Sequence, residues 1–393
     1  MSQTMKKFLS AGWLFAAAAL IGAGTTTAQS EPLVRVALLK DAQRIEFNIR
    51  GSYQIMDPQS GLPLDKGRRL PRTTARPGHP GIRLDDDQLN LKAIRLIPSK
   101  DVSIFVNGAD RRYRGELDIV QTGPDQLLVV NRLGLEDYVR GVLYHEVSDR
   151  WPMEALKAQA LATRSYALYQ MENNKAKPFD VTSDIYSQVY GGRSAERYRT
   201  NLAVDQTEGE VLTFQGKILP AYFHANSGGY TEDASELWKH DMAPLKGVRS
   251  EFSRYSPHYV WKKNFQSSEI QKKLNANGYQ LGLIKDIQVL ERNRSGRIRK
   301  LEIATRDGQT VTIAGKDFRN IIGPNLIRSN NYDVMMKGYY FDLFGKGWGH
   351  GVGMCQWGAR EMARQHYTYR DILSHYYPQT LVQDYRRQAL FRN

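Results

Sequence analysis

The stretch from Pro152 to about Glu172 constrains the fold of this 393-residue chain more than any other feature. A proline in the first turn, followed by a run rich in alanine and leucine, predicts a helix that begins at residue 152. This helix is apolar nearly all round, with Ala155, Leu156, Ala158, Ala160, Leu161, Ala162, Ala167 and Leu168. A helix without a polar face is buried on all sides, so we expect it at the centre of the protein.

Glu146 lies just before this helix, at the end of an apolar segment where an unpartnered carboxylate is costly. A carboxyl group held against apolar residues has a raised pKa and can act as a general acid near neutral pH. Alternatively, Glu146 could form a structural ion pair with Arg140 or Arg164. Arg164 must itself find a partner if the helix is buried. The sequence therefore predicts either a catalytic or a structural role for Glu146.

Short apolar or alternating runs predict strands at 33–39, 45–49 and 102–106. Hairpins are predicted over 113–130, over 211–219 around Gln215–Gly216, and over 301–313 around Asp307–Gly308. There is no internal repeat and no sharp linker. The expected fold class is therefore mixed α+β, rich in β-hairpins, with a central buried helix at about 152–172.

Residues 57–83 combine glycines with five prolines, at positions 58, 63, 71, 77 and 80. The same stretch carries the basic side chains of Lys66, Arg68, Arg69, Arg72 and Arg76. This composition predicts an exposed basic loop. Such a loop could grip an anionic polymer, or it could simply be solvated.

The first 28 residues have the pattern of a secretory signal peptide. Lys6 and Lys7 precede an apolar run over 8–24, and small residues follow up to Ala28. The run falls short of the roughly 20 residues that a comfortable transmembrane helix needs, although an uncleaved anchor is the alternative. No later stretch could span a membrane. We therefore expect an exported protein of the periplasm or cell envelope, without a stable membrane span after cleavage.

The charge of the chain points to a polyanionic partner. The formal net charge is +14, and removal of the two signal lysines lowers it to +12. A basic protein is drawn to polyanions such as nucleic acid, anionic lipid or an anionic cell wall. The sequence has no recognisable nucleic-acid-binding signature, so for an exported protein we expect the wall or a lipid surface rather than nucleic acid.

Cys355 is the only cysteine, which excludes an internal disulfide and any zinc site that uses two cysteines. His240 and Asp241 could ligate a metal but follow no recognised spacing, so we expect no metal and no cofactor. Cys355 and His350 could act as a nucleophile and its base. A lone cysteine is more often a small buried hydrophobe.

Two glycine-rich segments could contact a ligand. Residues 224–231 are polar and too rich in glycine for a regular element, so we expect a loop that lines a cleft. Five glycines between positions 345 and 353 let the backbone approach a ligand closely. Trp348 and Trp357 flank His350, and planar aromatic rings suit the faces of sugars. No Gly-Lys-Ser/Thr ends this run, so it is not a phosphate-binding loop.

Several segments, in one order, resemble the family of stage II sporulation protein D and the amidase enhancer. They are Leu-Glu-Asp-Tyr-Val-Arg-Gly-Val at 135–142, Glu146, Glu-Ala-Leu-Lys-Ala-Gln-Ala-Leu-Ala-Thr-Arg-Ser-Tyr at 154–166, Asp-Ile-Tyr-Ser-Gln-Val-Tyr at 184–190, 224–231, Asp-Phe-Arg at 317–319, and Gly-His-Gly-Val-Gly-Met-Cys-Gln-Trp-Gly-Ala at 349–359. The matches extend over roughly 33–378, and several motifs in one order are far more specific than any single one.

The resemblance implies a signal peptide at 1–28, a β-rich N-terminal region of the same family unit at 29–112, and a catalytic domain at 113–385. It implies an exported lytic transglycosylase that cuts peptidoglycan glycan strands lacking stem peptides. Glu146 takes the place of the family's catalytic glutamate, which gives 1,6-anhydro-muramic acid products. The alternative is a non-catalytic wall-binding enhancer of an N-acetylmuramoyl-L-alanine amidase, so a cell-wall amidase is a candidate partner.

The same resemblance implies substrate contacts by motif position. These residues are Arg164, Tyr166, His224, Ser227, Gly228, Gly229, His350, Gln356 and Trp357. The basic stretch at 57–83 matches no motif of the family, so the resemblance implies no role for it.

Overall fold

The computed structural model describes residues 31–106, 109–184, 186–238 and 240–387. The predicted signal peptide at 1–28 lies outside these residues. The described residues form helices and several sheets, which confirms the mixed α+β prediction. Among them, no helix is both long and apolar enough to cross a membrane.

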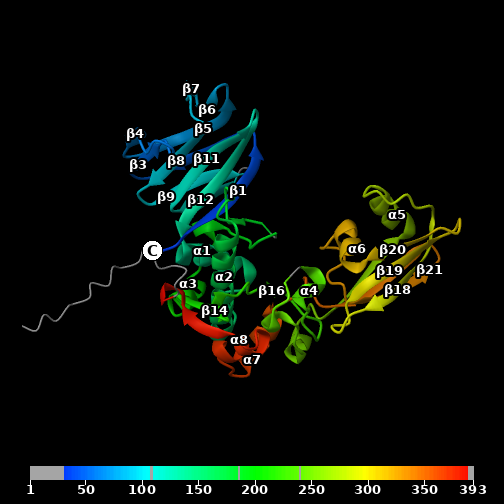
Figure 1. Ribbon diagram of the computed structural model, residues 1–393. Coiled ribbons are helices and arrows are strands. Elements are labelled where there is room, and N and C mark those ends of the chain that lie inside the picture. The colour runs from blue at the N-terminus through cyan, green and yellow to red at the C-terminus, as the bar shows by residue number, and fades with distance from the viewer. Residues whose placement is uncertain (1–30, 107–108, 185, 239, 388–393) are drawn as a thin grey trace, which may run out of the picture. The chain divides into compact units, whose positions relative to one another are not determined.

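Two antiparallel sheets form the N-terminal part of the described chain, drawn from blue to cyan in Figure 1. The first sheet contains, in order, β13 (Val181–Thr182), β1 (Leu33–Ala42), β12 (Gln126–Gly134), β11 (Glu116–Gly123), β8 (Ala93–Pro98), β3 (Tyr53–Met56) and β4 (Pro63–Gly67), with β13 joining β1 in parallel. The second contains β10 (Ala109–Arg114), β9 (Asp101–Val106), β2 (Ile45–Ile49), β5 (Leu70–Gly78), β6 (Gly81–Leu84) and β7 (Asp87–Gln88). Val36 and Ile119 from the first sheet share one hydrophobic cluster with Phe47 and Ile104 from the second, as in a β-sandwich.

The prediction of a loop over 57–83 is wrong, because β4, β5 and β6 occupy most of that stretch. Each proline lies where the ladder does not need its N–H. Pro63 begins the edge strand β4, Pro71 lies at a register shift between β2 and β5, and Pro77 lies beyond the last pairing with β2. The arginines of β5 alternate with buried residues and face outward, so the basic composition marks an exposed sheet face.

The helix predicted at 152–172 is confirmed as α2 (Met153–Asn173), and every residue from Ala155 to Leu168 except Lys157 is buried. It packs against α1 (Leu135–Glu146), α3 (Tyr198–Asp205), α7 (Gln356–Arg364) and α8 (Tyr369–Tyr376), as Figure 1 shows. Leu156 and Ala160 belong to the same hydrophobic cluster as the β-sandwich, whereas Leu161 and Ala162 belong to a second cluster shared with α8. The helix is buried on both sides, as its all-round apolar composition predicts.

Two small sheets pack close to α2. One contains β15 (Lys217–Ile218), β14 (Glu210–Phe214) and β24 (Leu381–Asp384), and its first two strands form the predicted hairpin at Gln215–Gly216. The other joins β16 (Phe223–His224) to β23 (Met354–Cys355) in parallel. The second pairing brings the two glycine-rich segments of the sequence together.

Residues 260–346 have a hydrophobic cluster of their own, which includes Phe265, Leu301, Phe318 and Phe341. Its sheets are β17 (Val260–Gln266), β22 (Tyr340–Lys346) and β21 (Tyr332–Lys337), and β18 (Ile284–Arg292), β19 (Ile298–Thr305) and β20 (Thr310–Ala314). The predicted hairpin at Asp307–Gly308 is confirmed between β19 and β20.

The remaining helices are α4 (Ala234–Leu237), α5 (Ser267–Asn275) and α6 (Gly315–Ile322). Short 3-10 turns lie at Gly192–Ala195, Ala243–Leu245, Glu251–Tyr255 and Tyr385–Arg387.

Candidate active site

Glu146 is the last residue of α1. The buried residues of this helix, Leu135, Tyr138, Val139, Val142 and Leu143, recur at a spacing of three and four. Such spacing places them on one face of the helix, and Glu146 continues the same face one turn later. The apolar stripe thus anchors the helix in the core and leaves the carboxyl group at the edge of that core.

Two neutral donors contact the carboxyl group of Glu146. The backbone N–H of Val189 donates to Oε1 at 3.1 Å, and Nε2 of Gln356 lies 3.5 Å from Oε2. Burial raises the pKa of Glu146, and these two hydrogen bonds lower it by less. No lysine, arginine or histidine of the described residues forms an ion pair with Glu146, although the sequence had left a pair with Arg140 or Arg164 open.

Gln356 begins α7, and Cys355 fixes this helix start. The Cys355 Sγ atom accepts hydrogen bonds from the backbone N–H groups of Gly358 and Ser227, both at 3.3 Å. Gln356 also donates to Oε1 of Gln159 on α2 at 3.3 Å. Helices α1, α2 and α7 therefore meet at the Glu146 carboxyl group.

A cleft of about 580 Å³ opens in front of Glu146. It is lined by Tyr144, His145, Glu146, Val147, Ser148, Trp151, Ala225, His258, Trp348, Gln356 and Trp357. Glu146 is the only acidic residue in this lining, within the part of the chain that the structure describes. The cleft is thus wide enough for a sugar ring and offers one carboxyl group.

Three tryptophans and a histidine form the walls of the cleft. The rings of Trp151 and Trp357 pack edge to face at 5.3 Å, and His258 packs against Trp348 at 4.9 Å and Trp357 at 5.6 Å. Burial, with a smaller contribution from Arg328, lowers the pKa of His258, so its ring is neutral at neutral pH. Aromatic side chains combine a large apolar face with fixed geometry, which suits the stacking of a pyranose.

Apart from Ala225, which lines the cleft, residues 224–229 support the backbone of the cleft wall. Asn226 and Trp348 exchange two backbone hydrogen bonds, at 2.9 and 2.8 Å. His224 and Ser227 are buried, and His224 Nδ1 lies 3.1 Å from the carbonyl oxygen of Val352. A Cβ atom at Gly228 would come within 2.8 Å of the Lys346 backbone, and the φ of +71° also favours glycine. Gly229 shares the positive φ, at +109°.

Arg164 and Tyr166 do not line the cleft. Arg164 is fully buried, and its guanidinium donates to both carboxylate oxygens of Glu136, at 2.8 and 2.7 Å. Tyr166 is also buried, with its ring 5.8 Å from that of Tyr222. Arg164 therefore forms a structural ion pair, but with Glu136 rather than Glu146, and its guanidinium is not available to a substrate.

His350 lines a different pocket, with Trp238 and Lys316, and does not contact the cleft. Cys355 is buried, and burial raises the pKa of its thiol, so it lacks the thiolate that a nucleophile needs. Within the described residues, no cluster of three or more His, Cys, Asp or Glu side chains is arranged to hold a metal ion.

Of the residues that the sequence singled out, the structure brings Glu146, Trp348, Gln356 and Trp357 together in the cleft. Trp151 and His258 also line the cleft, although neither was predicted from the sequence as a site residue. Trp151 lies between two strongly matching motifs, so its position was a usable signal. His258 has no neighbouring motif, and only the folded chain brings it between Trp348 and Trp357.

Two family models match the chain. One, described as "Stage II sporulation protein", covers residues 124–214, which include α1, α2 and Glu146. The other describes a domain of unknown function and covers residues 240–353. The first match contains the candidate catalytic residue, and the second contains His258 and Trp348.

Similar proteins support the same family. An uncharacterized protein of Brachyspira hyodysenteriae is 36% identical over 77% of this chain and 82% of its own length. Stage II sporulation protein D of Bacillus subtilis is 33% identical over 65% of this chain and 76% of its own length. The amidase enhancer of Bacillus subtilis is 26% identical over 63% of this chain and 40% of its own length.

Proposed function

Because this chain belongs to the stage II sporulation protein D family, we propose that it is an exported lytic transglycosylase of the periplasm or cell envelope. Its substrate is the glycan strand of peptidoglycan from which stem peptides have been removed. The signal-like N-terminus and the basic charge of the chain support an envelope location and an anionic polymer as partner.

Glu146 carries the chemistry in this proposal. Its protonated carboxyl group donates to the glycosidic oxygen while the bond from that oxygen to C1 of muramic acid breaks. The resulting carboxylate then accepts the proton of the C6 hydroxyl as the C6 oxygen bonds to C1. The products are a strand with a free 4-hydroxyl and a strand that ends in 1,6-anhydro-muramic acid, and no water is consumed.

The single observation that carries the proposal is that Glu146 is the only acid among the described residues that line the cleft, with a pKa raised by burial. Glycoside hydrolases generally need two carboxyl groups, because one must activate water or attack the sugar. A transglycosylase needs one, since the nucleophile belongs to the substrate. The raised pKa favours the protonated form that the first step requires.

Other residues of the cleft bind the substrate or position the carboxyl group of Glu146. Gln356 donates to Glu146 and fixes the orientation of its carboxyl group. Trp151, Trp348 and Trp357 offer ring faces to the sugars on either side of the broken bond. We leave Arg164 out of the substrate-binding set because Glu136 occupies its guanidinium.

The alternative function is a non-catalytic enhancer of an N-acetylmuramoyl-L-alanine amidase. The similarity to a protein named amidase enhancer supports this alternative, and the basic charge would serve wall binding in either case. An enhancer has no need for the protonated carboxyl group of Glu146, so its substitution separates the two functions.

The test is mass spectrometry of peptide-free glycan strands incubated with the mature protein, with Glu146→Gln and with Glu269→Gln. Glu269 is exposed on α5 and serves as the matched control. We expect 1,6-anhydro ends from the wild type and the control, and a rate reduced by about 10²–10⁴-fold in Glu146→Gln. Reducing ends would indicate a hydrolase, and no cleavage by the wild type would favour the enhancer.

A further inference from the structure

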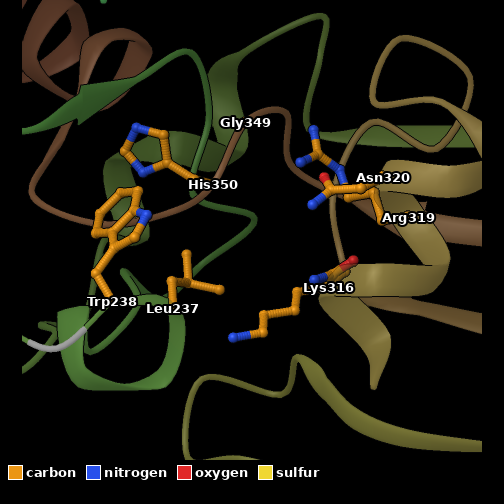
Figure 2. Close-up of a pocket in the computed structure, with 8 residues that line it drawn as sticks. Leu237, Trp238, Lys316, Arg319, Asn320, Gly349 and His350 are labelled. Atoms are coloured by element: carbon orange, nitrogen blue, oxygen red, sulfur yellow. The ribbon is translucent and has the colours of Figure 1, made fainter. Parts of the chain in front are cut away.

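A second pocket, of about 150 Å³, is lined by Gly349 and His350, the two residues that follow Trp348 in the chain. Figure 2 shows Trp238 and His350 on one wall, and Lys316, Arg319 and Asn320 on the opposite wall. Asn330 completes the polar lining. We call it the cationic pocket, because two cations and no acid line it within the described residues.

The charges of the cationic pocket are not neutralised by the protein. Arg319 donates only to backbone carbonyls, those of Ile327, Pro324 and Arg328, at 2.8, 3.2 and 3.1 Å. Within the described residues, neither Arg319 nor Lys316 forms an ion pair. Burial and the nearby Arg297 lower the pKa of Arg319 to about 10, so it remains charged at neutral pH. Arg319 is half-buried and Lys316 is exposed. An unpaired charge that is partly withdrawn from water is costly, and an anionic ligand would relieve that cost for Arg319.

Two acids of a neighbouring cavity are already engaged. Glu232 and Glu236 line the neighbouring cavity, which shares Lys316 with the cationic pocket. Glu232 accepts hydrogen bonds from the side chains of Asn293 and Ser295, and Glu236 is paired with Arg299. Neither carboxylate lines the cationic pocket itself.

The remaining lining suits a small polar group attached to an apolar body. Asn330 is only 9% exposed, and its Oδ1 atom has no hydrogen-bond partner within the described residues. Burial lowers the pKa of His350 to about 4, so its ring is neutral at neutral pH. Trp238 stacks on Tyr222 at 4.5 Å and is still 36% exposed, which leaves part of its indole free to contact a ligand.

The cationic pocket and the cleft are adjacent along the chain. Trp348 lines the cleft, and Gly349 and His350 line the cationic pocket. Neighbouring residues of one segment therefore line both sites.

We propose that the cationic pocket binds a carboxylate borne on a sugar, the free lactyl carboxylate of a muramic acid in stripped glycan. The identity of this sugar rests on the proposed function, whereas the carboxylate chemistry rests on the pocket. A stem peptide converts the lactyl carboxylate into a neutral amide with a bulky substituent. The pocket is only about a quarter of the volume of the cleft, so it accepts the short lactyl arm and excludes the peptide. The cationic pocket thus selects strands that an amidase has already processed.

The experiment follows the indole N–H resonance of Trp238 by NMR during titration of the whole mature protein. The probes are N-acetylmuramic acid, its lactyl methyl ester, N-acetylglucosamine and D-lactate. A Trp238→Phe variant assigns the resonance, and the signal of Trp357 reports separately on the cleft. Lys316→Gln removes one charge of the pocket, and Lys285→Gln, at an exposed position on β18, is its control.

We expect N-acetylmuramic acid to shift the Trp238 signal at a concentration at least tenfold lower than the ester or N-acetylglucosamine. Lys316→Gln should raise that concentration about tenfold and Lys285→Gln should leave it unchanged. Equal responses to the acid and its ester, or no effect of Lys316→Gln, would overturn the inference. A response to D-lactate as strong as that to N-acetylmuramic acid would assign the pocket to free small carboxylates instead of glycan.

These outcomes are separable from failure of the proposed function. Anhydro products without a Trp238 response would leave the transglycosylase standing and overturn the pocket assignment. A Lys316-dependent response without glycan cleavage would support the carboxylate pocket and remove the catalytic proposal.

Discussion

The two ends of helix α1 each carry a glutamate, and the two carboxyl groups have opposite surroundings. Glu136, in the first turn, accepts both hydrogen bonds of a bidentate pair from Arg164 and another from the backbone N–H of Gly209 at 3.2 Å. Glu146, at the last position, has only the neutral donors of Val189 and Gln356.

The helix itself reinforces this difference. A negative charge is favoured near the N-terminus of a helix, where Glu136 lies, and disfavoured near the C-terminus, where Glu146 lies. A cation and the helix dipole thus both favour negative charge at the Glu136 end of the helix. Burial and the dipole both oppose ionisation of Glu146. A buried glutamate is therefore a candidate acid when no cationic side chain packs against it.

Removal of the Glu136–Arg164 ion pair, at the N-terminal end of α1, should have the largest effect on stability. Glu136→Gln leaves the guanidinium of Arg164 buried and unpaired, which we expect to lower the free energy of unfolding by about 3–5 kcal/mol. Urea denaturation measures this change. Glu208→Gln, which breaks the exposed pair with Arg386, is the matched control and should cost about 1 kcal/mol or less. A loss below 1 kcal/mol in Glu136→Gln would remove the distinction between the two ends.

Truncation of an aromatic side chain in the cleft wall should have an intermediate effect, on substrate binding rather than on stability. Trp348→Ala removes a ring that packs against His258 at 4.9 Å and lines the cleft. We expect KM for stripped strands to rise about tenfold, which corresponds to roughly 1.4 kcal/mol, and Trp348→Phe to keep most of the affinity. If both variants bound glycan like the wild type, Trp348 would not be a sugar platform.

The smallest expected effect is on the pH dependence of catalysis, which reports the protonation of Glu146. Because burial raises its pKa, the acid form is lost, and kcat/KM should fall, as pH rises through that raised pKa. Gln356→Leu removes a hydrogen bond that favours the carboxylate, so this alkaline limb should move to higher pH. A pH profile of kcat/KM measures the position of the limb. A limb that moved to lower pH would show that Gln356 does not stabilise the ionised form.

The raised pKa of Glu146 also predicts the direction in which the free energy of unfolding changes with pH. A carboxyl group with a raised pKa in the folded state binds protons more tightly there than in the unfolded chain. The free energy of unfolding should therefore fall as pH rises from about 4.5 through the raised pKa. Glu146→Gln should abolish this contribution, and urea denaturation at pH 4 and pH 8 compares the two proteins. A wild-type protein that gained stability relative to Glu146→Gln over this range would contradict the raised pKa.

Local patterns predicted a substantial share of the fold. The all-round apolar run of α2 and the turns at Gln215–Gly216 and Asp307–Gly308 depend on neighbours close in sequence, and all three predictions were confirmed. The helical spacing of α1 was equally local and was overlooked. The stretch at 57–83 was mispredicted because composition does not reveal that its prolines fall at positions without ladder hydrogen bonds.

The sequence by itself determined the family and the buried central helix, and it marked Glu146 as the candidate acid, because motifs and periodicity are read along the chain. Only the tertiary structure decided which side chains meet. Arg164 finds Glu136 28 residues away, and Gln356 reaches Glu146 across 210 residues. His350, two residues from Trp348, faces a separate cationic pocket. Pairing across such distances depends on how packed elements close on one another, and no local spacing encodes it.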